Sequence, residues 1–178
     1  ALALEFLILT AARSGEVLEA RWCEFDLEAK VWTVPAVRMK AKREHRVPLS
    51  GRAVEILEAV KPLSNDKQEA VVFSAPKGGP LSINCFRALL LRMNLKGAEA
   101  TPHGFRSSFR DWCGEVSVFP REVAEAALAH VVGDATERAY RRGDALEKRR
   151  KLMDAWSEYC EFSGAGGSVV AIGKKYHA

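Results

Sequence analysis

The sequence predicts an α+β domain that is mainly helical, with a small antiparallel sheet in its N-terminal third. Two observations favour this fold class. Apolar residues recur at helical spacing in most segments of the 178-residue chain. Short runs of β-branched and aromatic residues, separated by turn-forming residues, are concentrated between residues 25 and 49, as is typical of hairpins. A chain of this length can bury one hydrophobic core.

Each element is predicted from its own local pattern of apolar, capping and turn residues. The N-terminal half is predicted to contain a helix over 2–9, a helix capped by Ser14, a hairpin over 25–34 with its turn at 28–30, a second extended pair at 37–39 and 46–49 around a basic tip, and a helix capped by Ser50. A strand at 71–73 and a helix from Ser82 to Met93 follow. The C-terminal part is predicted to contain a helix starting at Thr101-Pro102, a helix over 122–129 opened by Pro120, and a last helix capped by Asp144.

Composition and charge restrict the classes of function. No apolar run approaches the length of a membrane span, so no integral membrane protein is predicted. The net charge of +4 is compatible with nucleic-acid binding, and residues 38–46 hold five basic side chains against one acidic side chain. The four cysteines are scattered without CxxC spacing, which favours core positions in a reducing cytoplasm.

The chain opens inside an apolar periodic pattern and does not begin with Met. We therefore expect a piece of a longer protein whose N-terminal part is missing. The expected organisation is one folded domain over residues 1–163, followed by a flexible tail over 164–178 that starts with a Gly-rich link.

Six residues that together could act on one phosphate diester follow one another along the chain. Arginine guanidiniums neutralise phosphate oxygens and match their geometry. The departing sugar oxygen needs a proton, and a tyrosine can attack phosphorus and hold the strand covalently. In chain order, the six are Arg13, Lys40, His103, Arg106, His130 and Tyr140.

The local sequences around these residues are more restrictive than the residues alone. Taken singly, each also has an ordinary structural interpretation, such as a solvated arginine, a charged hairpin, a capped helix or a half-buried tyrosine. The contexts are Thr10-Ala11-Ala12-Arg13-Ser14-Gly15-Glu16, Lys40 placed eight residues before Pro48, Thr101-Pro102-His103-Gly104-Phe105-Arg106, Leu128-Ala129-His130, and Arg138-Ala139-Tyr140-Arg141-Arg142.

This order and these contexts resemble the catalytic domain of tyrosine recombinases, the phage and genomic-island integrases, from about Leu7 to about Tyr159. The resemblance implies the DNA breaking-rejoining fold, with the integrase catalytic domain at 1–163. It also implies a site-specific recombinase that integrates or excises a prophage or other mobile element through a 3′-phosphotyrosyl intermediate.

The resemblance also implies a role for each site residue. Tyr140 would be the nucleophile, and Arg13 and Arg106 would clamp the phosphate. The other implied roles are proton transfer or phosphate binding by His103, a bond to a non-bridging oxygen by His130, and protonation of the leaving 5′-oxygen by Lys40, with Lys42 as the competing assignment. The sequence departs from the family at three positions where glycine is common, namely Ala11, Ala41 and Ala129.

Partners and cofactors follow from the same resemblance. We expect double-stranded DNA attachment sites as partners, a homo-tetramer on DNA, a monomer for the isolated domain, and action at the bacterial nucleoid in the cytoplasm. No cofactor is expected, because the phosphotyrosyl bond preserves the energy of the broken linkage. No metal is expected either, since His103 and His130 lack further ligands at close spacing. The residues expected to contact DNA are Lys42, Arg43, His45 and Arg141.

Two alternative functions stay open from the sequence. A type IB topoisomerase-like enzyme would relax DNA with the same chemistry, and a DNA-binding module could have lost catalysis. A serine hydrolase is not predicted, because the sequence has no G-x-S-x-G motif.

Overall fold

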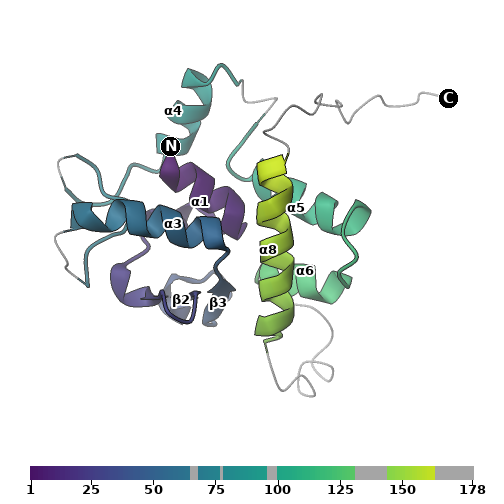
Figure 1. Cartoon of the computed structure of the whole chain (residues 1–178). Coiled ribbons are helices and arrows are strands. Elements are labelled where there is room, and N and C mark those ends of the chain that lie inside the picture. The colour runs from purple at the N-terminus through teal and green to yellow at the C-terminus, as the bar shows by residue number, and fades with distance from the viewer. Residues whose placement is uncertain (65–67, 77, 96–99, 131–143, 163–178) are drawn as a thin grey trace.

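The computed structural model describes residues 1–64, 68–76, 78–95, 100–130 and 144–162 (Figure 1). The predicted α+β, mainly helical class is confirmed. The elements are α1 (Leu2–Thr10), α2 (Ser14–Leu18), η1 (Trp22–Glu24), β1 (Phe25–Asp26), β2 (Val31–Val34), η2 (Ala36–Arg38), β3 (His45–Pro48), α3 (Gly51–Val60), η3 (Lys61–Ser64), α4 (Cys85–Arg92), α5 (Gly104–Glu115), α6 (Arg121–Ala127) and α8 (Leu146–Phe162), where η denotes a 3-10 helix.

The sheet has the antiparallel order β1-β2-β3. The predicted hairpin over 25–34 is confirmed, with Phe25 opposite Trp32. The second pair differs from the prediction, because β3 pairs with β2 and residues 36–38 form the 3-10 helix η2. Pro35 explains the change, since a proline has no N–H to continue the ladder. Residues 40–44 form the basic tip, a loop that leads into β3.

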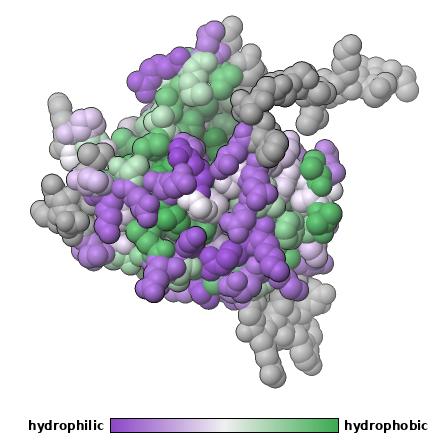
Figure 2. Space-filling model, viewed as in Figure 1, coloured by the Kyte–Doolittle hydropathy of each residue, from purple (hydrophilic) through white to green (hydrophobic). Residues whose placement is uncertain are grey.

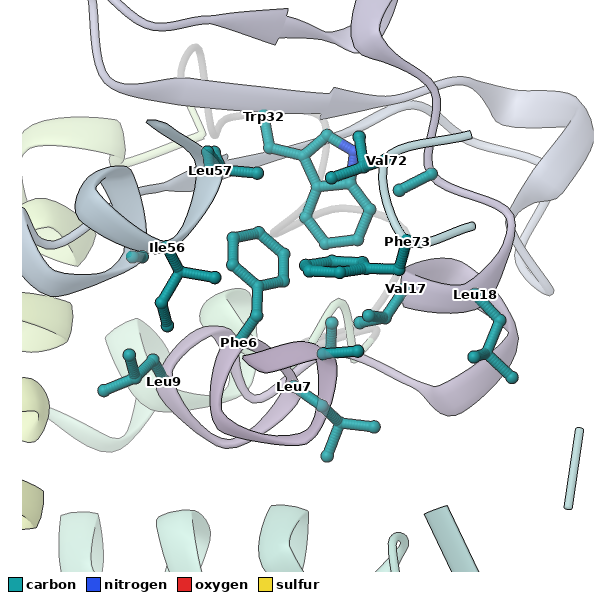
Figure 3. Close-up of a cluster of buried hydrophobic side chains, with 14 of the residues drawn as sticks. Phe6, Leu7, Leu9, Val17, Leu18, Trp32, Ile56, Leu57, Val72 and Phe73 are labelled. Carbon is teal, nitrogen blue, oxygen red and sulfur yellow. The ribbon is translucent and has the colours of Figure 1, made fainter. Parts of the chain in front are cut away.

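Two hydrophobic clusters form the core, and α1 touches both. The first joins α1, the sheet and α3, with Phe6, Trp32 and Leu57 fully buried (Figure 3). The second lies among α5, α6 and α8. Ile8 of α1 packs against both clusters, and its carbonyl accepts a 2.9 Å hydrogen bond from the Trp156 indole of α8. The backbone that leaves α1 is thereby fixed from two sides.

The last helix covers the second cluster with one face and meets solvent with the other. Leu152, Met153 and Trp156 of α8 are buried, whereas its charged residues other than the buried Arg149 are exposed or partly exposed. Figure 2 shows hydrophilic residues gathered over this part of the molecule. In the described ranges, no helix has the length and apolar character needed to cross a membrane.

The caps predicted at Ser50 and Asp144 are confirmed. The Ser50 hydroxyl accepts from the Ala53 N–H at 3.3 Å. The helix expected to start at Thr101-Pro102 begins at Gly104 with His103 as its N-cap, and the Thr101 hydroxyl accepts from the Gly104 N–H at 2.9 Å. Asp144 accepts from the Leu146 N–H at 3.2 Å.

Three other local predictions were wrong. Arg13, not Ser14, is the N-cap of α2, because the Glu16 carboxylate accepts the Arg13 backbone N–H. The helix expected from Ser82 begins at Cys85, since the Ser82 hydroxyl forms a turn with the Asn84 N–H. The strand expected at 71–73 is a single bridge between Val71 and Arg21.

Candidate active site

Arg13 is held rigidly at the start of α2. Its guanidinium Nη1 donates to Glu16 Oε1 at 2.7 Å, and its backbone N–H donates to Glu16 Oε2 at 2.9 Å. The Glu16 side chain is 6% exposed and the Arg13 side chain 30% exposed. The Glu16 carboxylate therefore fixes the position of the Arg13 guanidinium, and part of that guanidinium remains accessible to a ligand.

Arg106, from the first turn of α5, is buried and joins two helix ends. Its Nη1 donates to the carbonyl of Ala11, the C-cap of α1, and its Nη2 donates to the carbonyl of Leu128, the C-cap of α6, at 2.9 Å. The last carbonyls of a helix lack partners within the helix and carry partial negative charge. Two such carbonyls therefore fix the plane of the Arg106 guanidinium.

The two arginines lie within electrostatic range of each other although 93 positions of sequence separate residues 13 and 106. The pKa of Arg106 falls to about 10, first because burial disfavours its charge and second because Arg13 lies nearby, while Glu16 acts in the opposite direction. Arg106 remains charged at neutral pH. The fold thus places two like charges together, which an anion bound between them would stabilise.

Left-handed backbone occurs at two of the three alanines that replace a common family glycine. Ala11 has φ 48° and Ala129 has φ 53°. Each lies at the end of a helix whose C-cap carbonyl binds Arg106. At Ala129 the chain forms a Schellman turn, because its N–H bonds the Ala126 carbonyl at 3.2 Å and the His130 N–H bonds the Glu125 carbonyl at 2.9 Å. The left-handed residues at these helix ends orient the two carbonyls toward Arg106. The family's glycines at these positions were the sequence signal for left-handed backbone.

His103 lies exposed at the N-cap of α5, one turn before Arg106. Its carbonyl accepts the Arg106 backbone N–H at 3.1 Å. A Cβ added to Gly104 would approach the Thr101 hydroxyl to 2.9 Å, so glycine keeps the capping contact unstrained. The Thr-Pro-His-Gly context therefore shapes a helix start that leaves the imidazole open to solvent.

His130 is paired with an acid that the sequence analysis did not select. Its Nδ1 lies 2.6 Å from Oε2 of Glu125, whose side chain is 10% exposed. The Nε of Arg110 donates to Glu125 Oε1 at 2.9 Å. Burial alone would raise the pKa of Glu125, but the hydrogen bonds from His130 and Arg110 outweigh it and lower the pKa. The sequence signal that could have revealed this pair was an acid five residues before His130, at the end of a helix that stops between the two residues.

The basic tip stands away from these contacts. Lys40, Lys42 and Arg43 are exposed, and no side-chain ion pair or hydrogen bond of theirs occurs among the described residues. The Lys42 N–H donates to the Met39 carbonyl at 2.9 Å, and Lys42 has φ 50°, so the left-handed residue is Lys42 and not Ala41. The structure does not bring Lys40 into contact with Arg13 or Arg106.

Arg38, at the base of this tip, is half-buried and has a structural role. Its Nη1 donates to Glu24, and its Nη2 donates to the backbone carbonyl of Glu16. The indole N–H of Trp32 donates to the same Glu24 carboxylate at 2.9 Å. Arg38 therefore ties the tip to the helix that holds Arg13, a role that its place in a basic run did not reveal.

His45 faces inward, toward α6. Its Nε2 lies 3.2 Å from the Ala127 carbonyl, and the side chain is half-buried. Burial, followed by the positive charge of Arg149, lowers the pKa of His45 to about 4. The ring is therefore neutral at pH 7 and donates its Nε2 proton to the carbonyl. Its predicted contact with DNA stays a prediction, and the geometry shows a packing contact between β3 and α6.

Tyr140 and Arg141 lie outside the described residues, as does the predicted break at Gly133-Asp134. The described residues continue from Asp144, whose carboxylate and carbonyl each accept a 2.8 Å hydrogen bond from the buried Arg149. The predicted tail, 164–178, is also outside them. In the part of the chain that the structure describes, no group of three or more His, Cys, Asp or Glu residues is placed to bind a metal ion.

Known proteins resemble this chain over most of its length. The model of the phage integrase family matches residues 1–147. Prophage integrase IntA of Escherichia coli K12 is 40% identical over 163 residues, which cover 92% of this chain and 39% of that protein. The integrase of Enterobacteria phage P4 is 31% identical, over 91% of this chain and 40% of its own length. The chain thus spans about two fifths of these relatives.

Solved structures share the fold. The integrase of mycobacterium phage Brujita superposes with a TM-score of 0.62 at 19% identity, over 86% of this chain and 51% of the integrase chain. The XerA recombinase superposes with a TM-score of 0.56 at 14% identity, over 93% of this chain and 58% of XerA. The family match, the relatives and the fold agree, and the chain belongs to the phage integrase family.

Proposed function

We propose that this chain is the catalytic domain of a site-specific DNA recombinase, which cuts and rejoins strands at double-stranded attachment sites. The observation that carries the proposal is the pairing of Arg13 with Arg106. One is anchored by Glu16 and the other by two helix ends, so neither needs to rearrange when an anion binds. Two preorganised guanidiniums suit a phosphodiester, whose negative charge grows as it is attacked.

The proposed reaction exchanges one phosphate ester for another. The Tyr140 oxygen attacks phosphorus, its proton passes to a base, and the bond from phosphorus to the 5′-oxygen breaks. His103 is the candidate base because its imidazole is exposed at the start of α5, three residues before Arg106. Lys40 is the candidate acid for the 5′-oxygen, and Lys42 remains the competitor. A 5′-hydroxyl from another strand then reverses the step, so no cofactor is consumed.

The exposed basic tip supports DNA as the partner. Lys40, Lys42 and Arg43 have no competing acidic partner among the described residues, which leaves their charges available for phosphates. Arg141 is proposed as a further DNA contact from its place beside Tyr140. Assembly of a homo-tetramer on two duplexes is part of the proposal, as is the division into a domain over 1–163 and a tail over 164–178.

The test is covalent capture of DNA. The protein is mixed with a labelled library of nicked duplexes whose central positions are randomised, and adducts that survive detergent are counted. We expect an adduct with the wild-type chain and none with Tyr140→Phe, while the control Tyr159→Phe, altered in the last helix, keeps it. An adduct with the Tyr140 variant, or none with the wild type, would overturn the proposal.

Recovered sequences then allow recombination to be separated from relaxation. Two duplexes that carry the captured sequence and different labels are incubated with the protein. Exchange of the labels supports a recombinase. Relaxation of a supercoiled plasmid without exchange would favour the topoisomerase-like alternative.

A further inference from the structure

Glu125 is a buried acid next to His130, one of the predicted site residues. The proposed reaction gives Glu125 itself no role. Its side chain is 10% exposed, yet it meets three cationic or protonatable side chains. Nδ1 of His130 lies at 2.6 Å, Nε of Arg110 at 2.9 Å and Nε of Arg121 at 3.9 Å. This carboxylate is ionised at neutral pH, because the hydrogen bonds from His130 and Arg110 lower its pKa despite its burial.

The backbone places His130 next to Glu125. In the Schellman turn that ends α6, the N–H of residue 130 bonds the carbonyl of Glu125, which brings the two residues together in space. The imidazole is 41% exposed, so one side of the ring faces the carboxylate and the rest faces solvent. Only Nδ1 is held by the carboxylate.

We propose that Glu125 is a positioning residue for His130, which fixes the proton on Nδ1 and turns Nε2 toward the substrate phosphate. The carboxylate accepts the Nδ1 proton, so the neutral ring must have its lone pair on Nε2. In the doubly protonated ring, Nε2–H is a charged donor for a non-bridging phosphate oxygen. The proposed direction of Nε2 rests on the proposed function, whereas the proton position on Nδ1 does not.

Arg110 gives the proposal a sharp consequence. Its Nε–H occupies the second oxygen of Glu125, so both oxygens act as acceptors. In Glu125→Gln the amide has one acceptor oxygen, and the charged Arg110 competes for it. The amide NH₂ group then faces His130 and donates to Nδ1. The neutral imidazole should consequently change to the tautomer with its proton on Nε2.

The first experiment measures this tautomer without any activity. The chain is labelled with ¹⁵N-histidine, and its four histidines are distinguished with a His130→Gln variant. Long-range proton–nitrogen correlations, recorded where the ring is neutral, should show the proton on Nδ1 in the wild type and on Nε2 in Glu125→Gln. Arg121→Gln is the matched control, since it removes a charge 3.9 Å from the same carboxylate and should leave the proton on Nδ1. A wild-type ring with its proton on Nε2, or the same tautomer in both proteins, would overturn the proposal.

The second experiment measures the cleavage step on a captured DNA sequence. We expect Glu125→Gln to lower the rate constant of adduct formation about tenfold and to change DNA affinity less than about twofold. In the His130→Gln background the same substitution should have no further effect on the rate, because a positioning residue acts only through its partner. An equal loss in both backgrounds would show a structural role for Glu125 and overturn the proposal.

If the wild-type chain forms no adduct, the proposed function fails, and the tautomer measurement still decides whether Glu125 positions His130. Should Glu125→Gln fail to fold, Glu125→Asp, with a shorter reach, replaces it and should give the same non-additivity.

Discussion

Replacing Ala129 by glycine should stabilise this protein, although alanine-to-glycine changes usually do the opposite. Ala129 has φ 53° at the position after the C-cap of α6, where the Schellman turn requires left-handed backbone. That conformation costs an L-residue about 1–2 kcal/mol, and glycine avoids the cost. Glycine also loses about 0.5–1 kcal/mol through its freer unfolded chain. The expected net gain in the free energy of unfolding is about 0.5–1 kcal/mol.

Two other alanines serve as controls with different expected signs. Ala11 is also left-handed, with φ 48°, but it is 1% exposed. Ala11→Gly should be close to neutral, because the lost burial of a methyl group, about 0.8 kcal/mol, offsets the relieved backbone. Ala126 lies within α6 and is half-buried like Ala129. Ala126→Gly should cost about 1 kcal/mol, the ordinary helix penalty.

Urea unfolding followed by circular dichroism measures all three changes under one condition. The stability order should be Ala129→Gly first, the wild type and Ala11→Gly next, and Ala126→Gly last. Parallel unfolding slopes would show that the variants unfold to the same extent. If Ala129→Gly were destabilised as much as Ala126→Gly, the turn at residue 129 would not impose the strain described here, and the reasoning would be refuted.

Three further outcomes are expected. Arg106→Lys should unfold more readily by about 1–3 kcal/mol in urea, because one of two buried helix-end carbonyls loses its donor; adduct formation should also fall at least about tenfold, and equal rates for Lys and Arg would show that the planar fork is unimportant. Lys40→Ala should be slow on normal DNA and largely rescued when sulfur replaces the bridging 5′-oxygen, whereas Lys42→Ala should mainly weaken salt-dependent binding; the reverse pattern would assign the acid to Lys42. Because the pKa of His45 is about 4 when folded and 6.5 ordinarily, the unfolded chain takes up a proton first as the pH falls. The contribution of His45 to the free energy of unfolding should therefore drop by up to about 3 kcal/mol between pH 6.5 and 4 and stay constant below that range, and His45→Gln should remove this part of the pH dependence.

Short-range interactions could be predicted from the sequence because both partners lie within a few residues. The hairpin over 25–34, the cap at Ser50 and the mainly helical class were all of this kind. Errors of local prediction arose where another nearby group was a better partner. Glu16 replaced the expected cap at Ser14, and Pro35 ended the ladder that the second extended pair needed.

The sequence by itself determined the family, the order of the six predicted site residues and the glycine positions at which this chain has alanine. Tertiary structure alone decided what fixes these residues in space. Arg106 binds backbone carbonyls 95 and 22 residues away, and every residue has a carbonyl, so no side-chain pattern marks which one will be the acceptor. For the same reason the basic run over residues 38–46 did not reveal that Arg38 and His45 contact the carbonyls of Glu16 and Ala127, which come into reach only when the elements pack.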